Sequence, residues 1–285
     1  MTAAEREASL AAGQISFLLS DWVGERFDLP ETNLPDLHLF EPSSAGRMLR
    51  QEWGLGEKPV TNMIQLLESK GVRVFSLAEN TAHVNAYSLW RKDVPYVFLN
   101  TFKTAESSRF DAAHELAHLV LHQDSGARGR NAEEQANHFA SAFLMPEADV
   151  RSVLPIVANL RQLIVTKRRW RVSLAALNYR VHELKLISDW KYRGLCIEII
   201  RMGYNKNEPD EIEREKSVVW EKVLKTLWVE KITQLDIADQ LALPSSEVSG
   251  LLLGVLNTAG AWKEGPLQPL TIVSEQDDDQ PQAIA

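Results

Sequence analysis

The hydrophobic pattern divides the first part of the chain into helical and β-rich stretches. Three stretches have helical periodicity, namely residues 1–26, 44–53 and 60–70. A proline-containing connector at 27–44 lies between the first and the second. Gly71 is a natural residue to end the third of these helices. Three runs rich in β-branched and aromatic residues follow, at 72–77, 84–90 and 96–100. We expect these runs to form a small antiparallel sheet.

Two further helical patterns follow the predicted sheet and are joined by a polar, glycine-containing loop. The first, residues 105–122, is apolar nearly all round, as in a buried helix. The second, residues 132–144, has an apolar stripe that includes Phe139 and Phe143, and its small residue Ala136 allows another helix to approach closely. We expect the two helices to pack against each other.

The rest of the chain is helical by pattern almost throughout. Residues 217–229 are amphipathic, and residues 232–253 resemble a helix-turn-helix with its turn at Leu243 and Pro244. The end of the chain is acidic and has a composition typical of disorder. These features predict an α+β protein with four parts, which are a helical lead and linker (1–44), a core with the sheet and two packed helices (45–150), a helical C-terminal region (151–263) and a disordered acidic tail (264–285).

The helix predicted over residues 105–122 contains the pentapeptide His114-Glu115-Leu116-Ala117-His118. Residues four apart on a helix differ by ~40° around its axis, so both imidazoles can bind one ion. Glu115 lies ~100° round from His114, where a carboxylate can act as a base on a bound water. Such a pentapeptide also arises by chance as a surface pair. In a helix that is apolar nearly all round, however, two buried unpaired histidines would be costly, so we expect a metal site.

The second helix offers a third ligand. Glu133 and Asn137 lie four residues apart on one face and can face the two histidines. Two histidines and one glutamate leave the fourth tetrahedral position for water, which is the arrangement of a catalytic zinc site and not of a closed structural one. The register with Asn137 favours Glu133, and Glu134 is the competing candidate. We therefore expect a Zn²⁺ cofactor.

The composition excludes several other kinds of protein. The chain is 45% hydrophobic and 25% charged, as in ordinary globular proteins. Its formal net charge of −8 opposes nucleic-acid binding by the protein as a whole. Cys196 is the only cysteine, so neither an intramolecular disulfide nor a thiolate zinc site is possible. The sequence has neither the pattern of a signal peptide nor an apolar run that could span a bilayer, so we expect a soluble, cytoplasmic protein.

Two segments resemble the ImmA/IrrE family of bacterial and phage peptidases, namely residues 109–122 and 133–146. In that family the two histidines of the motif and a glutamate on the next helix bind zinc, and the glutamate of the motif is the catalytic base. Matched residue by residue, the resemblance implies that the zinc ligands are His114, His118 and Glu133. It implies that the base is Glu115. Together with the hydrophobic pattern, this predicts a zincin-like fold with the small antiparallel sheet packed on the metal-binding helices.

The resemblance also implies a biological role. Family members cleave transcriptional repressors of the helix-turn-helix type during mobile-element induction or stress responses. We therefore expect a zinc-dependent endopeptidase whose partner is a helix-turn-helix repressor, cleaved at a specific site. Many members carry an N-terminal repressor-like domain, and residues 1–44 look like the linker that usually follows it.

Asn137 and His122 are candidates to support the metal ligands from behind. His122 lies four residues beyond His118, although the helix dipole is the commoner reason for a histidine at a helix end. His138 lies ~140° from Glu133 around its helix, so we expect it to face elsewhere.

DNA contact is an alternative that two features keep open. The basic run 167–171 could bind phosphate, although one short cluster on an acidic chain is usually a solvated helix face. The second helix of the helix-turn-helix pattern carries Glu247 and no lysine or arginine, so we do not expect direct DNA binding. The rival function is a metal-containing sensor that regulates transcription by protein or DNA contact without proteolysis. Such a module needs no base at Glu115.

Overall fold

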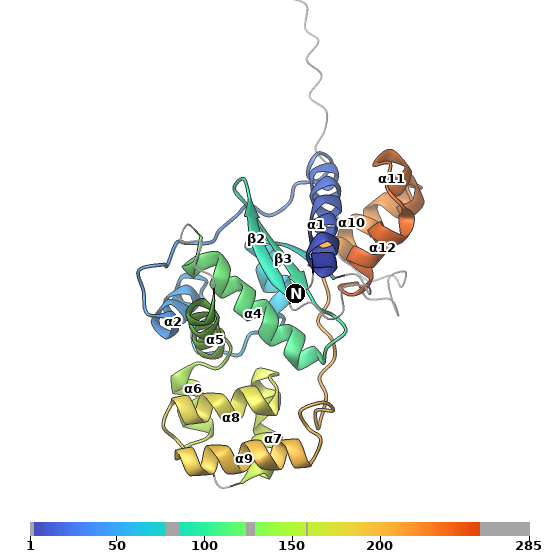
Figure 1. Ribbon diagram of the computed structural model, residues 1–285. Helices are drawn as coiled ribbons and strands as arrows, with labels where there is room; N and C mark the ends of the chain where they lie inside the picture. The colour runs from blue at the N-terminus through green and yellow to red at the C-terminus, as the bar shows by residue number, and fades with distance from the viewer. Residues whose placement is uncertain (1–2, 78–85, 124–128, 158, 257–285) are drawn as a thin grey trace, which may run out of the picture.

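A computed structural model describes residues 3–77, 86–123, 129–157 and 159–256, and within them it confirms an α+β fold. The elements in chain order are α1 (Ala3–Gly24), α2 (Pro42–Glu52), α3 (Met63–Ser69), β1 (Arg73–Ser76), β2 (Tyr87–Arg91), β3 (Val94–Leu99), α4 (Ala105–Leu121), α5 (Arg130–Leu144), α6 (Glu147–Val153), α7 (Leu160–Trp170), α8 (Leu174–Glu183), α9 (Asp189–Arg201), α10 (Val218–Val229), α11 (Gln234–Gln240) and α12 (Ser245–Leu253). Figure 1 shows α4 and α5 beside the sheet, α6–α9 together at one end of the molecule, and α10–α12 beside α1.

The described strands form one sheet in the order β1-β3-β2. β2 and β3 make an antiparallel hairpin, but β1 pairs with β3 in parallel, with Val74 opposite Val97. The expectation of a wholly antiparallel sheet is therefore wrong. A simple meander would place β2 in the centre, yet β2 is only half-buried, whereas β3 is buried on both faces and needs a strand on each side. β1 runs in the same direction as β3 in either arrangement, so its place beside β3 makes the pairing parallel.

Each face of the sheet is covered by a helix. On one face, Phe17 of α1 packs edge-on against Tyr96, with ring centroids 4.9 Å apart. On the other face, Trp90 Nε1 donates a hydrogen bond to the carbonyl oxygen of Leu119 in α4 at 3.2 Å. Because successive side chains of a strand point to opposite faces, Ser88 points to the same side as Trp90. This face therefore brings β2 alongside the helix with the pentapeptide.

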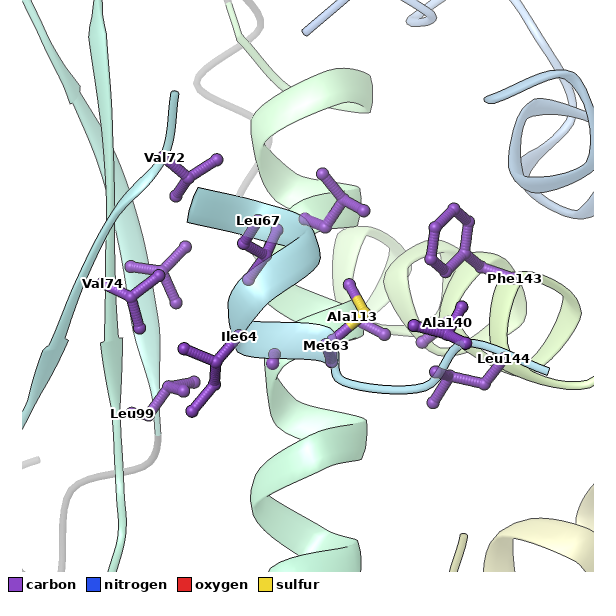
Figure 2. Packing of buried hydrophobic residues seen from close by; sticks show 14 of the residues in the cluster. Met63, Ile64, Leu67, Val72, Val74, Leu99, Ala113, Ala140, Phe143 and Leu144 are labelled. Atoms are coloured by element: carbon purple, nitrogen blue, oxygen red, sulfur yellow. The ribbon is translucent and has the colours of Figure 1, made fainter. Parts of the chain in front are cut away.

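α3 fills the space between the sheet and the helices α4 and α5. Figure 2 shows Ile64 and Leu67 of α3 next to Val74, with side chains of α4 and α5 beyond them. The helix ends as predicted at Gly71, which has a φ of 81°. The Val72 amide donates to the Leu67 carbonyl oxygen at 3.1 Å, which completes a Schellman motif.

Small residues set the spacing of the helices around the site. Ala113 of α4 and Ala136 and Ala140 of α5 are fully buried. On the other side of α5, a Cβ atom added to Gly46 of α2 would lie 3.2 Å from the Phe139 carbonyl oxygen. The positions of α4 and α5 are thus fixed by contacts that leave little room for adjustment.

The basic run 167–171 is only partly the solvated helix face that we expected, because Arg168 and Arg169 are exposed but Lys167 is not. Lys167 is fully buried, and its Nζ lies 3.0 Å from Glu106 Oε1 and 3.2 Å from Glu208 Oε2. The reason is the register of α7, which turns residues 160, 163, 167 and 170 towards the core. A lysine on this face requires acidic partners, because an unpaired buried charge is costly.

Two helices occupy the segment with the helix-turn-helix pattern, α11 and α12, as predicted. The second of them does not project from the molecule. It packs against α1 and β1, and its residues Val248, Leu251 and Leu252 are buried. The apolar face of α12 therefore contributes to the core.

No helix among the described residues is long and apolar enough to cross a membrane. The predicted acidic tail at 264–285 lies outside the described residues, as does the beginning of the second predicted strand at 84–85.

Candidate metal centre

α4 carries the pentapeptide and begins at a well-formed cap. The Thr104 hydroxyl oxygen accepts a hydrogen bond from the Ser107 amide at 3.2 Å. The helix then runs to Leu121 without glycine or proline, and one side of it is buried against α3, α5 and the sheet. His114 and His118, one turn apart, remain partly exposed on a common side, with 14% and 21% of their side chains accessible.

α5 brings Glu133 to the two histidines. Nε2 of His114 lies 3.1 Å from Nε2 of His118 and 3.2 Å from Oε2 of Glu133. Nε2 of His118 lies 3.6 Å from Oε1 of Glu133. Each of the three residues thus offers a potential ligand atom within 4.8 Å of the other two, and the two histidines approach different oxygens of the Glu133 carboxylate. The competing candidate, Glu134, instead pairs with Arg130 at 2.8 Å.

These separations suit a small divalent cation. Atoms that bind a tetrahedral zinc ion at 2.0–2.2 Å lie ~3.3–3.6 Å from one another. The three distances in the cluster, 3.1, 3.2 and 3.6 Å, are close to these values. The donor set of two imidazoles and one carboxylate also suits zinc. The residues present therefore fit a metal.

Asn137 orients the first histidine. Its side-chain oxygen Oδ1 lies 3.0 Å from Nδ1 of His114. An amide oxygen can only accept a hydrogen bond, so Nδ1 carries the proton and the lone pair of Nε2 faces the cluster. The prediction that Asn137 supports a ligand from behind agrees with this contact.

The second histidine is oriented by a chain of two hydrogen bonds. Oε1 of Gln135 accepts from Nε2 of His122 at 2.8 Å, and Nδ1 of His122 lies 3.0 Å from Nδ1 of His118. Because the Gln135 oxygen only accepts, His122 holds its proton on Nε2 and its Nδ1 is an acceptor. Nδ1 of His118 must then be the donor. The Nε2 lone pair of His118 is left for the cluster.

Burial also keeps His118 in the form that binds metals. Desolvation, together with the neighbouring His114 and His122, lowers the pKa of His118 to about 4. The imidazole is therefore neutral at physiological pH, and a neutral imidazole is the ligand form.

Glu115 is almost completely buried beside the cluster. Its Oε2 accepts a hydrogen bond from the Ser88 hydroxyl of β2 at 2.7 Å. Burial raises the pKa of Glu115 to about 8, the negative charges of Asp111 and Glu133 act in the same direction, and the Ser88 hydrogen bond opposes them. The carboxyl group is thus held next to the cluster without belonging to it, as the 100° offset on the helix predicts.

A cavity of about 830 Å³ opens over the cluster. Its walls include residues 86–90 of β2 and its approach, the histidines of α4, and Glu133 and Asn137 of α5. β2 is an edge strand of the described sheet, and its residues 87–90 line this cavity. We name this space the metal cleft.

Comparison with known protein families matches residues 67–182 to the family described as the IrrE N-terminal-like domain, a family of peptidases. These residues belong to the ImmA/IrrE family of metallopeptidases. The matched region runs from α3 to α8 and contains both helices of the cluster. A search of curated proteins found no match. Residues 67–182 thus match a metallopeptidase family, and the candidate metal-binding group of His114, His118 and Glu133 lies within them.

Two residues of this ImmA/IrrE site escaped the sequence analysis. Ser88 contacts Glu115 from β2, and Gln135 ends the hydrogen-bond chain behind His118. The alternation of β2 placed Ser88 and Trp90 on one face, but only the packing of the sheet on α4 shows which helix residue they meet. His138 faces away from the cluster as predicted and contacts Glu183 at 2.7 Å.

Proposed function

We propose that the chain is a zinc-dependent endopeptidase in which His114, His118 and Glu133 bind the metal and Glu115 is the general base. The observation that carries this proposal is the cluster of His114, His118 and Glu133 beside the buried carboxyl group of Glu115. This carboxyl group accepts a hydrogen bond from Ser88 and does not belong to the cluster. A ligand set of three leaves one tetrahedral position for water or substrate, which is the mark of a catalytic centre.

Held by His114, His118 and Glu133, a zinc ion would act as a Lewis acid that polarises the scissile carbonyl and lowers the pKa of a bound water towards ~7. Glu115 accepts the proton of the attacking water and passes it to the departing amine. Ser88 holds Oε2 of this carboxyl, so Oε1 is left for the water. Glu115 must be ionised to accept a proton, and a positive charge at the cluster favours that form against the effect of burial.

The edge strand β2 gives the substrate a direction. An extended peptide can add to the outer edge of β2 by main-chain hydrogen bonds, which would hold its backbone along the metal cleft. Such binding reads the backbone and not the side chains. Selection among sequences therefore depends on the other walls of the cleft.

We further propose that the substrate is a helix-turn-helix repressor cleaved at a specific site, in a bacterial stress or mobile-element response. Support comes from the resemblance of residues 109–122 and 133–146 to peptidases with this role, and a cytoplasmic location follows from the substrate. The buried Lys167 and the packed apolar face of α12 give no support to the rival DNA-contact function.

The Glu115→Gln variant tests the mechanism. Glutamine has almost the same size and still accepts the Ser88 hydrogen bond, but it cannot take a proton from water at neutral pH. We expect the variant to retain metal and melting temperature and to lose ~10²–10⁴-fold in peptide cleavage. Equal cleavage by both proteins would remove Glu115 from the mechanism.

Co-expression with a candidate helix-turn-helix repressor separates the peptidase function from the sensor function. The peptidase proposal expects the repressor to be shortened on a gel by the wild type and to remain intact with Glu115→Gln. If the repressor stays intact with both proteins while its target genes respond equally to both, the sensor function is correct.

A further inference from the structure

A second cavity, of about 650 Å³, lies beside the metal cleft at the junction of α4, α5 and α8. The two cavities share four lining residues, which are Lys103, Phe110, Asp111 and Asn137. Asn137 is also the residue that orients His114. We name this second cavity the side pocket. Because the shared residues border both cavities, a molecule in the metal cleft lies next to the side pocket.

The side pocket offers an apolar surface and few free polar groups. Phe110, Ala176 and Tyr179 supply apolar atoms from α4 and α8. The charged side chains of the lining have partners: Lys103 Nζ lies 2.7 Å from Asp111 Oδ2, and Oε1 of the exposed Glu134 lies 2.8 Å from Nε of the exposed Arg130.

The remaining polar side chains of the lining have partners as well. His138 contacts Glu183, Tyr179 contacts His138 at 3.4 Å, and Ser173 caps α8 by accepting from the Ala176 amide at 3.1 Å. An apolar group that enters the pocket therefore displaces water without leaving a buried polar group unpaired.

We propose that the side pocket binds a large apolar side chain of the substrate, such as leucine, methionine or phenylalanine, within three residues of the scissile bond. This inference rests on the proposed endopeptidase function and names the substrate class that the site selects. The main-chain pairing along β2 positions the peptide, and the side pocket selects its sequence.

The dimensions of α4 give this distance from the scissile bond. Phe110 lies four residues before His114, and Ser107 lies seven residues before it. With a helical rise of 1.5 Å per residue, these separations correspond to ~6 Å and ~10 Å along the axis of α4. An extended peptide advances ~3.3 Å per residue. The pocket therefore lies two or three peptide residues from the centre of the cluster.

Two substitutions at adjacent positions of α8 provide the test. Ala176→Phe places a ring in the side pocket, whereas Ala175→Phe adds the same ring at an exposed position that does not line it. The probe is a synthetic peptide library, randomised at six positions and cleaved by the full-length metal-loaded chain, with products identified by mass spectrometry. We expect wild type and Ala175→Phe to prefer a large apolar residue at one position within three of the cleaved bond.

The measured quantity is the ratio of kcat/KM between the best library peptide and the same peptide with alanine at the preferred position. Filling an apolar subsite typically discriminates by ~10–100-fold, so Ala176→Phe should reduce this ratio towards one, while Ala175→Phe preserves it. Loss of general stability would lower both rates and leave the ratio unchanged. If Ala176→Phe does not fold, Tyr179→Ala removes a wall of the same pocket and should lower the same ratio.

Binding gives a readout that does not need turnover. In the Glu115→Gln background, the fluorescein-labelled best peptide should bind ~10–100-fold more weakly when Ala176→Phe is added, as followed by fluorescence anisotropy. If the wild type cleaves the library but Ala176→Phe changes neither the kcat/KM ratio nor the peptide affinity, the proposed role of the side pocket is wrong while the endopeptidase function stands. A wild type with bound metal that cleaves no peptide overturns the proposed function together with it.

Discussion

Substitution of Gln135 by leucine should weaken metal binding although Gln135 does not touch the cluster. The side chain accepts from Nε2 of His122 at 2.8 Å, and this bond fixes Nδ1 of His122 as the acceptor for Nδ1–H of His118. Without Gln135, His122 is free to carry its proton on Nδ1. His118 must then accept at Nδ1 and place its own proton on Nε2, where the metal binds.

The magnitude follows from the energy of such supporting contacts. Removing an outer hydrogen-bond partner of a ligating histidine typically reduces metal affinity by ~10–100-fold, equivalent to ~1.4–2.7 kcal/mol. Because two bonds separate Gln135 from the ligand, we expect Gln135→Leu near the lower limit, at ~10-fold. Gln135→Glu keeps an acceptor in place and should retain affinity.

A competition titration of the purified chain with a zinc chelator of known affinity measures the effect. Asn131→Leu, an equivalent change at an exposed position of α5, is the control and should bind as the wild type does. Equal affinities of wild type, Asn131→Leu and Gln135→Leu would show that the hydrogen-bond chain does not orient His118.

Three further predictions concern stability and DNA. A Cβ atom at Gly71 would overlap the backbone of Glu31, whereas Gly54 also has a positive φ but has open space around it. In chemical denaturation, Gly71→Ala should therefore lower the free energy of unfolding by more than the ~1–2 kcal/mol expected for Gly54→Ala. Burial raises the pKa of Glu68 from 4.5 to about 7, so the folded state binds a proton more tightly than the unfolded state does. The contribution of this group to the free energy of unfolding, up to about 3 kcal/mol, is present below pH 4.5 and is lost as the pH rises through 7. The free energy of unfolding, measured by chemical denaturation at pH 5 and at pH 8, should therefore fall less between these pH values for Glu68→Gln than for the wild type. The full chain should not shift duplex DNA in gels at physiological salt, and a salt-sensitive shift would instead support the DNA-contact function.

The metal cluster could be predicted because its signals are local. The two histidines lie one helical turn apart, and Glu133 needs only the packing of two helices joined by a short loop. Each step uses periodicity within one element, which is the most dependable information in a single sequence. The helix end at Gly71 is predictable for the same reason.

Features that depend on contacts between distant elements could not be predicted in this way. Ser88 meets Glu115 only because β2 lies across α4, and the side pocket exists only because α8 returns to α4 and α5. The order of the strands is an intermediate case. The unbroken apolar run of β3 indicated a central strand, and the more polar β2 indicated an edge, so the sequence held information that favoured the observed order over a meander.

The basic run 167–171 also contained a readable signal. Leu160, Leu163, Lys167 and Trp170 follow the spacing of one helix face, so Lys167 occupies an apolar stripe. Composition alone suggested a solvated cluster. What the sequence did not provide was the identity of the partners, because Glu106 and Glu208 come from segments far from α7 along the chain.

The zinc content of the purified full-length chain, measured for the wild type, Glu133→Gln and Glu134→Gln, tests the central claim most directly. The two variants remove the same charge from neighbouring positions of α5, but only Glu133 faces the histidines. We predict one zinc ion per wild-type chain, retention in Glu134→Gln, and loss or strong weakening in Glu133→Gln. A wild type without zinc above background, or a Glu133→Gln variant that holds it as tightly as the wild type does, would contradict the metal centre described above.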